Sequence, residues 1–135
     1  MGTNTIPAQL LVDYLLQTNP NPQINCNVSE LVNFYLSEGR AEGVRGDIAF
    51  LQSLLETGWF SYGKDVQPSQ NNFCGLGATG GVPGLSFPTP QIGVRAQIQH
   101  LKAYGSTDPL INARVDPRFS GVVRGCALKW SDLGS

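Results

Sequence analysis

The stretch from residue 44 to residue 58 constrains the fold more than any other part of this chain. Its large apolar residues recur with the spacing of one face of an α-helix, at Val44, Ile48, Leu51 and Leu55. Phe50 and Leu54 widen this stripe, and Gly58 stands where a glycine commonly ends a helix. We therefore expect a helix from Val44 to Gly58 that is buried along this stripe.

Start and stop signals indicate two helices before this one. Pro7 can open the first, and the prolines of "TNPNPQ" from Thr18 to Gln23 end it. The second begins with an N-cap at Asn27 or Ser29, and Gly39 stands where a glycine would end it.

Glycines are crowded after the third helix. Five of them lie between Gly75 and Gly84 in a region with few charges, which favours short strands and turns over helix. We expect a small β-rich lobe from Ser61 to Pro88, with strands near residues 73–78 and 85–87. Thr89–Pro90 then combines a capping threonine with a proline at the first helical position, so a fourth helix should begin there.

The chain has 135 residues, which fits a single domain over residues 1–135 with a mainly helical α+β fold. Only 14% of the residues are charged and the net charge is −1. The chain therefore lacks the positive electrostatic potential that would attract nucleic acid or an anionic membrane. A neutral polar ligand such as a sugar suits this composition. No apolar run approaches the length of about 20 residues that spans a bilayer, and no Cys/His spacing indicates a metal site.

The three cysteines, Cys26, Cys74 and Cys126, leave at least one thiol unpaired within a monomer. We expect buried thiols or one optional disulfide, because a chain of this length supports a core without cross-links.

His100 has no partner that would complete a catalytic triad, and we interpret it as structural. "RGD" at Arg45–Asp47 lies at a helix start, where we expect solvated polar surface.

Glu56 stands in the last turn of the third helix, on a face apart from the apolar stripe. On a helical wheel it lies about 80° outside the stripe, so it should border the core and look onto the segment that follows. The unsatisfied carbonyl groups of a helix end disfavour a negative charge, and Trp59 and Phe60 offer apolar cover. Both effects favour the protonated acid, which can donate a proton to a leaving group.

Three segments in order carry a resemblance to a known family: "GDIAFLQSLLETGWF", "NNFCGLGATGG" and "SFPTPQIGVRAQIQHLKAY". They resemble the bacterial glucosaminidase domain of glycoside hydrolase family 73, in a form seen in clostridia and their relatives. The resemblance runs from about Glu42 to Trp130 and covers most of the chain. It implies a lysozyme-like fold and an endo-β-N-acetylglucosaminidase that cleaves peptidoglycan glycan strands. It also implies an extracellular or cell-wall setting, as for secreted autolysins or phage endolysins.

The resemblance assigns roles to individual residues. The general acid is Glu56. Along the substrate cleft the resemblance places Asn71, Asn72, Phe73 and Gly75. For the asparagines a turn role is an equal alternative, because Asn tolerates unusual backbone angles. Trp59 and Phe60 either stack on a sugar ring or pack in the core.

The chain departs from the family pattern in two places. Many members carry a second acid in the β-rich insert, but no Asp or Glu occurs here between Val66 and Asp108. Candidates for a second acid are Asp65, Glu42 and Asp116. The family's Asp-Pro-x-Tyr-Ala reads "VDPRFS" here, so Phe119 stands at the tyrosine position, where we expect it to contact substrate although it supplies no hydroxyl. One route without a second acid is attack by the substrate's own N-acetyl group.

Other functions remain open at this point. A lytic transglycosylase or a muramidase also works with one catalytic glutamate, and a domain that kept only the shape would bind glycan without cleaving it. The missing tyrosine and second acid favour binding, whereas the intact Glu56 in its Thr57-Gly58-Trp59 context favours an enzyme. "GLGATG" at residues 75–80 lacks the following helix and acidic residue of a dinucleotide site, so we expect no cofactor. The expected partner is peptidoglycan, and we expect a monomer.

Overall fold

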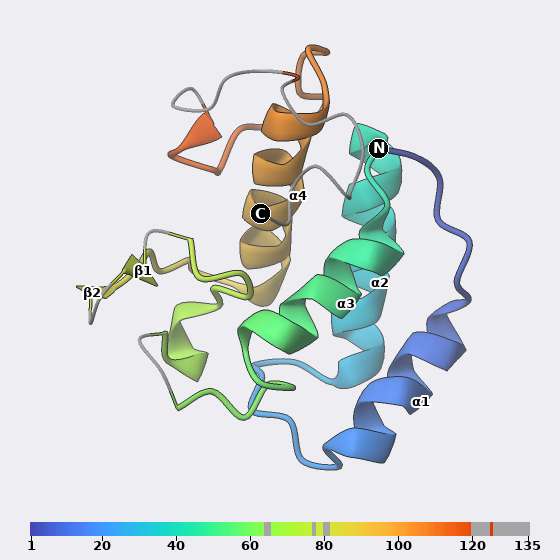
Figure 1. The fold of residues 1–135 in the computed structure, drawn as a ribbon, viewed down its shortest axis with the longest axis vertical. Coiled ribbons are helices and arrows are strands. Elements are labelled where there is room, and N and C mark those ends of the chain that lie inside the picture. The colour runs from blue at the N-terminus through green and yellow to red at the C-terminus, as the bar shows by residue number, and fades with distance from the viewer. Residues whose placement is uncertain (64–65, 77, 80–81, 120–124, 126–135) are drawn as a thin grey trace.

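The computed structural model describes residues 1–63, 66–76, 78–79, 82–119 and 125. It is mainly helical, as the sequence predicts, which fits the lysozyme-like helical domain implied by the resemblance. In chain order the elements are α1 (Ala8–Thr18), α2 (Val28–Glu42), α3 (Gly46–Glu56), the 3-10 helix η1 (Pro68–Gln70), β1 (Ala78–Thr79), β2 (Val82–Pro83) and α4 (Pro90–Gly105) (Figure 1). Of the helices described, none has the length and apolar character needed to cross a bilayer.

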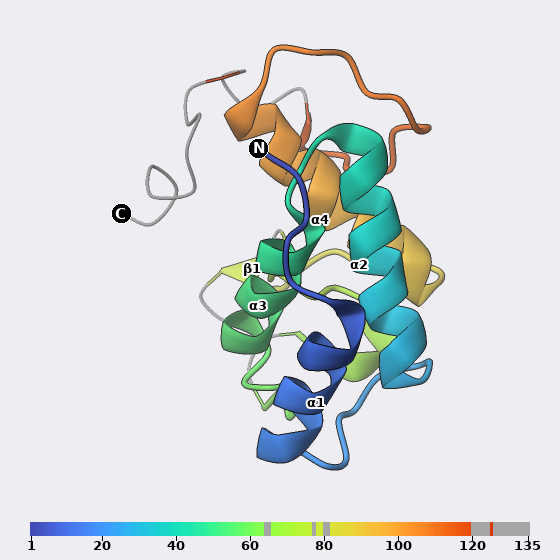
Figure 2. The same ribbon diagram turned by 90° about the vertical axis from the view of Figure 1, so that its right-hand side faces the viewer.

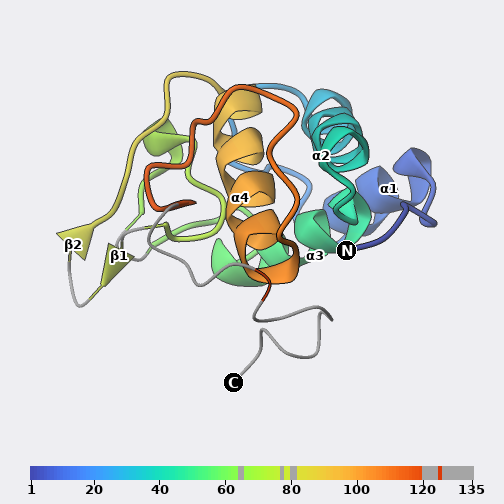
Figure 3. The same cartoon turned by 90° about the horizontal axis from the view of Figure 1, so that it is seen from above.

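Helix α2 lies at the centre of the helical core. It packs against α1, α3 and α4, and Figure 3 shows it between α1 and α4. The largest buried side chains here are aromatic: Tyr35, Phe50, Phe60 and Phe73. The Tyr35 and Phe50 rings meet edge-on at 5.6 Å between centroids, and those of Phe60 and Phe73 at 5.9 Å. Because Phe60 and Phe73 lie outside the helices, this aromatic packing docks two loop segments onto the helical core.

Capping side chains start two of the helices, at Asn27, which is one of the two N-caps that the sequence left open, and at Thr89 as predicted. Asn27 Oδ1 accepts from Glu30 N at 2.8 Å, while Glu30 Oε1 accepts from Asn27 N at 3.3 Å. Thr89 Oγ1 accepts from Ile92 N at 3.2 Å, with Pro90 as the first helical residue. Each oxygen satisfies a backbone N–H that has no partner within its helix, which is why these local signals predict helix starts well.

Two glycines allow α2 and the start of α3 to touch backbone to backbone. A Cβ atom on Gly46 would lie 1.9 Å from Tyr35 O, and one on Gly39 would lie 2.6 Å from Gly46 N. Helix α2 therefore continues through Gly39 to Glu42, and Gly43 forms its C-cap with a left-handed φ of 71°. The predicted helix end at Gly39 was wrong, because the glycine there serves helix packing.

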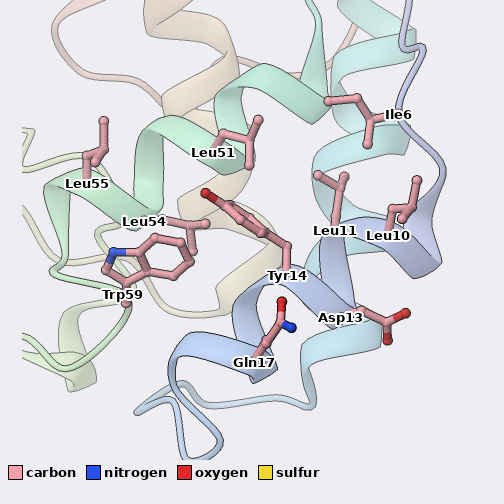
Figure 4. A pocket seen from close by; sticks show the side chains of 10 residues that line it. All are labelled: Ile6, Leu10, Leu11, Asp13, Tyr14, Gln17, Leu51, Leu54, Leu55 and Trp59. Atoms are coloured by element: carbon pink, nitrogen blue, oxygen red, sulfur yellow. The ribbon is translucent and has the colours of Figure 1, made fainter.

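Helix α3 is shorter than expected and buries a different face. It begins at Gly46, and its buried side chains are those of Asp47, Ala49, Phe50, Ser53 and Leu54. Leu55 is 76% exposed. Together with Leu51 it lines an apolar groove of about 490 Å³ between α1 and α3 (Figure 4). The predicted stripe was centred on the wrong face, because α1 leaves part of the Leu51–Leu55 side accessible.

The region from Ser61 to Pro88 contains less β structure than expected. Its described strands, β1 and β2, have two residues each and pair antiparallel, with Ala78 opposite Pro83. Of the ranges where we expected strands, residues 73–76 and 85–87 are turns and irregular backbone. The predicted β-rich lobe was wrong, because loop contacts replace most of a strand ladder here. Phe87 N, for example, donates to Gln70 O at 2.7 Å.

A buried aspartate ties the N-terminal segment to the start of α3. Asp47 is 0% exposed, and its Oδ2 accepts from Thr5 N at 2.8 Å, Ile6 N at 3.0 Å and Arg45 Nη2 at 2.7 Å. Figure 2 shows this segment running along the helices before α1 begins. Burial alone would raise the pKa of Asp47, but the Arg45 guanidinium and backbone N–H groups lower it to about 2. The expectation of solvated surface at "RGD" was therefore wrong for Asp47.

We expect Asp47→Asn to lower the free energy of unfolding at pH 7 by about 2 kcal/mol, because a neutral amide loses the charge-assisted bonds. A carboxylate with a lowered folded-state pKa stabilises the fold above its unfolded pKa of about 4. It loses this contribution as the pH falls through its folded-state pKa of about 2. The difference from wild type should therefore close between about pH 4 and pH 2.

Urea denaturation at a series of pH values measures this difference. Asp13→Asn, which neutralises an exposed carboxylate on α1, is the matched control and should change stability little. A destabilisation of Asp47→Asn that stays constant down to pH 2 would contradict the assigned role of the charge.

Cys26 and Cys74 are free cysteines of intermediate burial, and Cys126 lies outside the described residues. Burial, with a smaller effect of the Glu30 carboxylate, raises the pKa of Cys26 to about 11, so its thiolate is disfavoured at neutral pH.

We expect replacement of all three cysteines by Ser or Ala to leave a folded protein, because the helical core needs no cross-link. Thermal melting by circular dichroism compares this variant with wild type in reductant and without it. Loss of folding in both the substituted and the reduced wild-type protein would show that a disulfide is required.

Candidate active site

The chain reverses direction directly after Glu56 through a turn of left-handed backbone. Residues 58–60 have φ angles of 58–59°, although only Gly58 lacks a side chain. Trp59 and Phe60 in this conformation each cost on the order of 1 kcal/mol, so the surrounding structure must hold them there. The sequence pattern Glu-Thr-Gly-Trp is thus a helix end followed by a constrained turn.

The side chain of Thr57 fixes this turn from within. Its Oγ1 donates to Ser53 O at 2.8 Å and accepts from Phe60 N at 2.9 Å, and both bonds are buried. From outside the turn, Asn19 Nδ2 donates to Trp59 O at 2.7 Å. The position of Glu56 is therefore set by a bonded backbone and not by bonds of its own carboxylate.

The Glu56 carboxylate faces the loop of residues 71–76. A Cβ atom on Gly75 would lie 3.8 Å from Glu56 Oε2. The carboxyl group of Glu56 therefore faces the main chain of Gly75, which has no side chain. Glu56 is exposed, and its carboxylate accepts no hydrogen bond from the residues that the structure describes. Its oxygens are therefore available to a ligand that enters beside Gly75.

This loop is fixed to α4 by a close approach of the two backbones. A Cβ atom on Gly93 would lie 1.8 Å from Asn71 O, so only glycine permits this contact. Asn71 itself has a left-handed φ of 52°, and its Nδ2 donates to Phe87 O at 3.0 Å. Asn72 Nδ2 donates to Leu76 O at 2.9 Å, and its Oδ1 accepts from Leu76 N at 3.0 Å.

Several residues that were predicted to line the cleft are buried and hold the backbone of the site in place. Asn71 and Asn72 are buried, and their amides bond to protein groups, which is the turn role that the sequence left open. Phe60 and Phe73 are also buried, at 0% and 1% exposure, so these two rings belong to the core. All four support the fold of the site, and their predicted contact with substrate stays untested.

The remaining predicted contacts lie where a ligand can reach them. Trp59 is partly exposed, meets Tyr14 edge-on at 5.1 Å between ring centroids, and lines the groove between α1 and α3. Gly75 faces Glu56, and Phe119 is partly exposed beside Asp116. Substrate contact by these three residues stays a prediction.

Glu42 ends α2, close to the start of α3, whereas Glu56 ends α3, so the role of Glu42 as a second acid stays a prediction. Helix α3, with 11 residues, separates the two, which corresponds to roughly 15 Å, whereas paired glycosidase carboxyls lie about 5–9.5 Å apart. Burial alone would raise the pKa of Glu42, but the N–H groups of Asn112 and Ile111 and an ion pair with Lys102 at 2.9 Å lower it. Asp65 lies outside the described residues.

Asp116 is the remaining candidate, and the structure pairs it with a residue that sequence reasoning set aside. Asp116 is 0% exposed, and its Oδ2 lies 2.9 Å from His100 Nδ1. Burial raises the pKa of the Cys74 thiol to about 12, and the carboxylates of Glu56 and Asp116 contribute to this shift. Cys74 thus lies within electrostatic reach of both acids. The sequence analysis missed the contact between His100 and Asp116 because the two residues are 16 positions apart and no motif of that spacing indicates it.

Comparison with known proteins matches residues 32–130 to the glucosaminidase family, described as mannosyl-glycoprotein endo-beta-N-acetylglucosaminidase. The matched range contains Glu56, the turn after it and the loop that faces it. The chain belongs to the glucosaminidase family.

A relative in Borreliella burgdorferi (strain ATCC 35210 / DSM 4680 / CIP 102532 / B31), described as an uncharacterized protein, is 43% identical to this chain over 124 residues. The match covers 91% of this chain but 60% of the relative, so the chain spans about three fifths of that protein's length. Comparison with solved structures found no match.

Membership of the glucosaminidase family supports a glycoside hydrolase of the peptidoglycan-hydrolase type. The expected clostridial form of the domain stays a prediction.

We expect Thr57→Val to lower the free energy of unfolding by about 1–3 kcal/mol, because it leaves the buried N–H of Phe60 without an acceptor. The turn should then loosen, so glycan cleavage should fall as well. Thr3→Val, at an exposed position, is the matched control. Urea denaturation measures the effect, and unchanged stability of Thr57→Val would show that the hydroxyl does not hold the turn.

Proposed function

We propose that this domain hydrolyses the glycan strand of peptidoglycan as an endo-β-N-acetylglucosaminidase, with Glu56 as the general acid. The observation that supports this most directly is the setting of Glu56. Its carboxyl is exposed at the end of α3, faces the bare backbone of Gly75 and is held in place by the Thr57 turn. A glycosidic oxygen that lies beside Gly75 would be within reach of this acid.

The geometry suits proton donation better than a structural role. A carboxyl group that only stabilised the fold would be expected to bond to nearby groups, as the buried Glu42 does with Lys102. Glu56 instead presents both oxygens to solvent beside a loop whose backbone is fixed by Gly93 and Asn72. Pre-positioning of an acid against a rigid surface is what general acid catalysis requires.

Two routes lead from a protonated leaving group to the product. In the first, the 2-acetamido oxygen of the substrate attacks the anomeric carbon, which needs no second carboxylate and retains the configuration. In the second, a water molecule attacks directly with the help of a base and inverts the configuration. Both routes use Glu56 in the same way and differ in the anomer that is first released.

The proposed substrate is polymeric and lies outside the cell membrane, so the proposed setting is the cell wall or the extracellular space. A low charge fraction suits a site for a mostly neutral glycan. Trp59, partly exposed near the end of α3, offers an aromatic surface for a sugar ring.

We expect Glu56→Gln to reduce glycan-strand cleavage about 10²- to 10⁴-fold, because the amide keeps the size but donates no catalytic proton. Folding should survive, since the carboxylate accepts no bond from the described residues and a helix C-terminus disfavours its charge. Release of reducing ends from purified peptidoglycan measures the rate, and thermal melting checks the fold. Asp13→Asn removes the same charge from an exposed site and serves as the control.

The reaction products decide between this function and its alternatives. Mass spectrometry of digested peptidoglycan should show reducing-end N-acetylglucosamine. Reducing-end N-acetylmuramic acid would indicate a muramidase, and the anhydro sugar a lytic transglycosylase. A folded Glu56→Gln protein with wild-type activity would exclude the proposed role of this residue, and binding without any cleavage by wild type would indicate a glycan-binding domain.

A further inference from the structure

The side chain of His100 is held by Asp116 and keeps one ring nitrogen free. Its Nδ1 lies 2.9 Å from Asp116 Oδ2, and Asp116 Oδ1 accepts from Arg118 N at 2.9 Å. An ionised carboxylate only accepts hydrogen bonds, so Nδ1 carries the proton in this contact. In the neutral ring the lone pair therefore lies on Nε2, for which the described residues provide no partner.

Hydrogen bonds with Gln99 fix the backbone that leads into Asp116. Gln99 is 0% exposed, and its Oε1 accepts from Val115 N at 2.8 Å and from Asp116 N at 3.1 Å. Its Nε2 donates to Ala113 O at 2.8 Å. The neighbouring residue on α4 thus holds the segment that orients His100. Tyr104, one turn further on, packs edge-on against the imidazole at 5.3 Å between centroids.

One loop connects this pair with Glu56. Gly75 faces the Glu56 carboxylate, and the next residue, Leu76, packs with Ala96 in a small apolar cluster. Ala96 precedes His100 by one turn of α4, and Val115, next to Asp116, packs against the same cluster. Figure 1 and Figure 3 show the last part of the described segment, up to residue 119, on the same side of α4 as the strands β1 and β2. Glu56 and the elements that carry the His–Asp pair therefore all lie beside the segment of residues 75–76.

Side-chain exposure fits a role for the ring in proton transfer. The His100 side chain is 24% exposed, whereas Asp116 behind it is 0% exposed. A histidine that only satisfied a buried aspartate would not need an accessible second nitrogen. A buried carboxylate behind a partly exposed imidazole is the arrangement by which proteins orient a histidine for proton transfer.

We propose that His100, oriented by Asp116, is the base that activates water in the glycan cleavage assigned to Glu56. This proposal rests on the proposed function. It replaces the second carboxylate that the sequence lacks between Val66 and Asp108. Asp116 acts in it as a positioning residue, because it holds the ring and does not touch the water.

The step balances without a cofactor. His100 Nε2 takes a proton from water as the water oxygen bonds to the anomeric carbon. The bond from that carbon to the glycosidic oxygen breaks, and the leaving oxygen takes the proton of Glu56. The products are two glycan ends, an imidazolium and a carboxylate, and proton exchange with solvent restores both residues. The sugar first released has the inverted configuration.

His100→Asn is the sharpest variant, because its amide nitrogen replaces Nδ1 and keeps a bond to Asp116 while Nε2 is lost. We expect kcat to fall about 10²- to 10⁴-fold with little change in KM. In His100→Ala, added imidazole should restore part of the lost rate, which a purely structural residue would not allow. Tyr104→Phe keeps the ring that packs against His100 and should retain activity. Thermal melting of each variant checks the fold.

The configuration of the first product, followed by proton NMR on soluble glycan strands, gives an independent readout. Inversion together with imidazole rescue would support the proposal. A retained configuration, or a folded His100→Asn protein with wild-type kcat, would overturn it and leave the role of Glu56 intact. If His100→Asn fails to fold, rescue of His100→Gln or His100→Ala by imidazole decides, and absence of rescue in a folded variant overturns the proposal. If wild type cleaves no glycan, the proposed function itself fails.

Discussion

The side chain of Gln97 joins three helices through one buried amide. From α4 its Nε2 donates to Ala49 O of α3 at 3.0 Å, and its Oε1 accepts from the Tyr35 hydroxyl of α2. Gln97 is 1% exposed, so loss of these partners would cost about 1–3 kcal/mol for each group left unbonded. The helices therefore cannot rotate against one another without breaking this contact. The rotation of α3 decides the side on which Glu56 emerges, so the candidate site depends on a core glutamine.

The site itself is built from close backbone contacts more than from large side chains. Gly46 brings α3 against α2, and Gly93 brings α4 against the loop at Asn71. Both contacts would place a Cβ atom under 2 Å from a carbonyl oxygen. Because the helix end and the loop are each fixed by such a contact, the gap between Glu56 and Gly75 has little freedom to change. A rigid gap of this kind suits the proposed general acid, which must donate its proton to one glycosidic oxygen of a glycan strand.

The buried acids among the described residues have structural partners, which distinguishes the exposed Glu56 from them. Glu38 pairs with Arg95 at 2.7 Å, and Glu42 and Asp47 pair with cations of their own. These ion pairs hold α2, α4 and the N-terminal segment in place. Asp116 is also bonded, but to a histidine whose second nitrogen remains open. Among the described residues, the carboxylates that hold the fold are therefore distinct from the exposed Glu56 and from a His–Asp pair whose ring has one nitrogen without a described partner.

The sequence by itself determined the features that depend on neighbouring residues. It placed helix starts at Asn27 or Ser29 and at Thr89, because capping acts within one turn, and it placed Glu56 in the last turn of a helix. It failed on the small β lobe, on the buried face of α3 with its exposed Leu55, and on the pairing of His100 with Asp116. Only the tertiary structure decided these, because hydrophobic burial and long-range hydrogen bonds depend on which segments meet. Periodicity along one helix does not state from which side its neighbours approach.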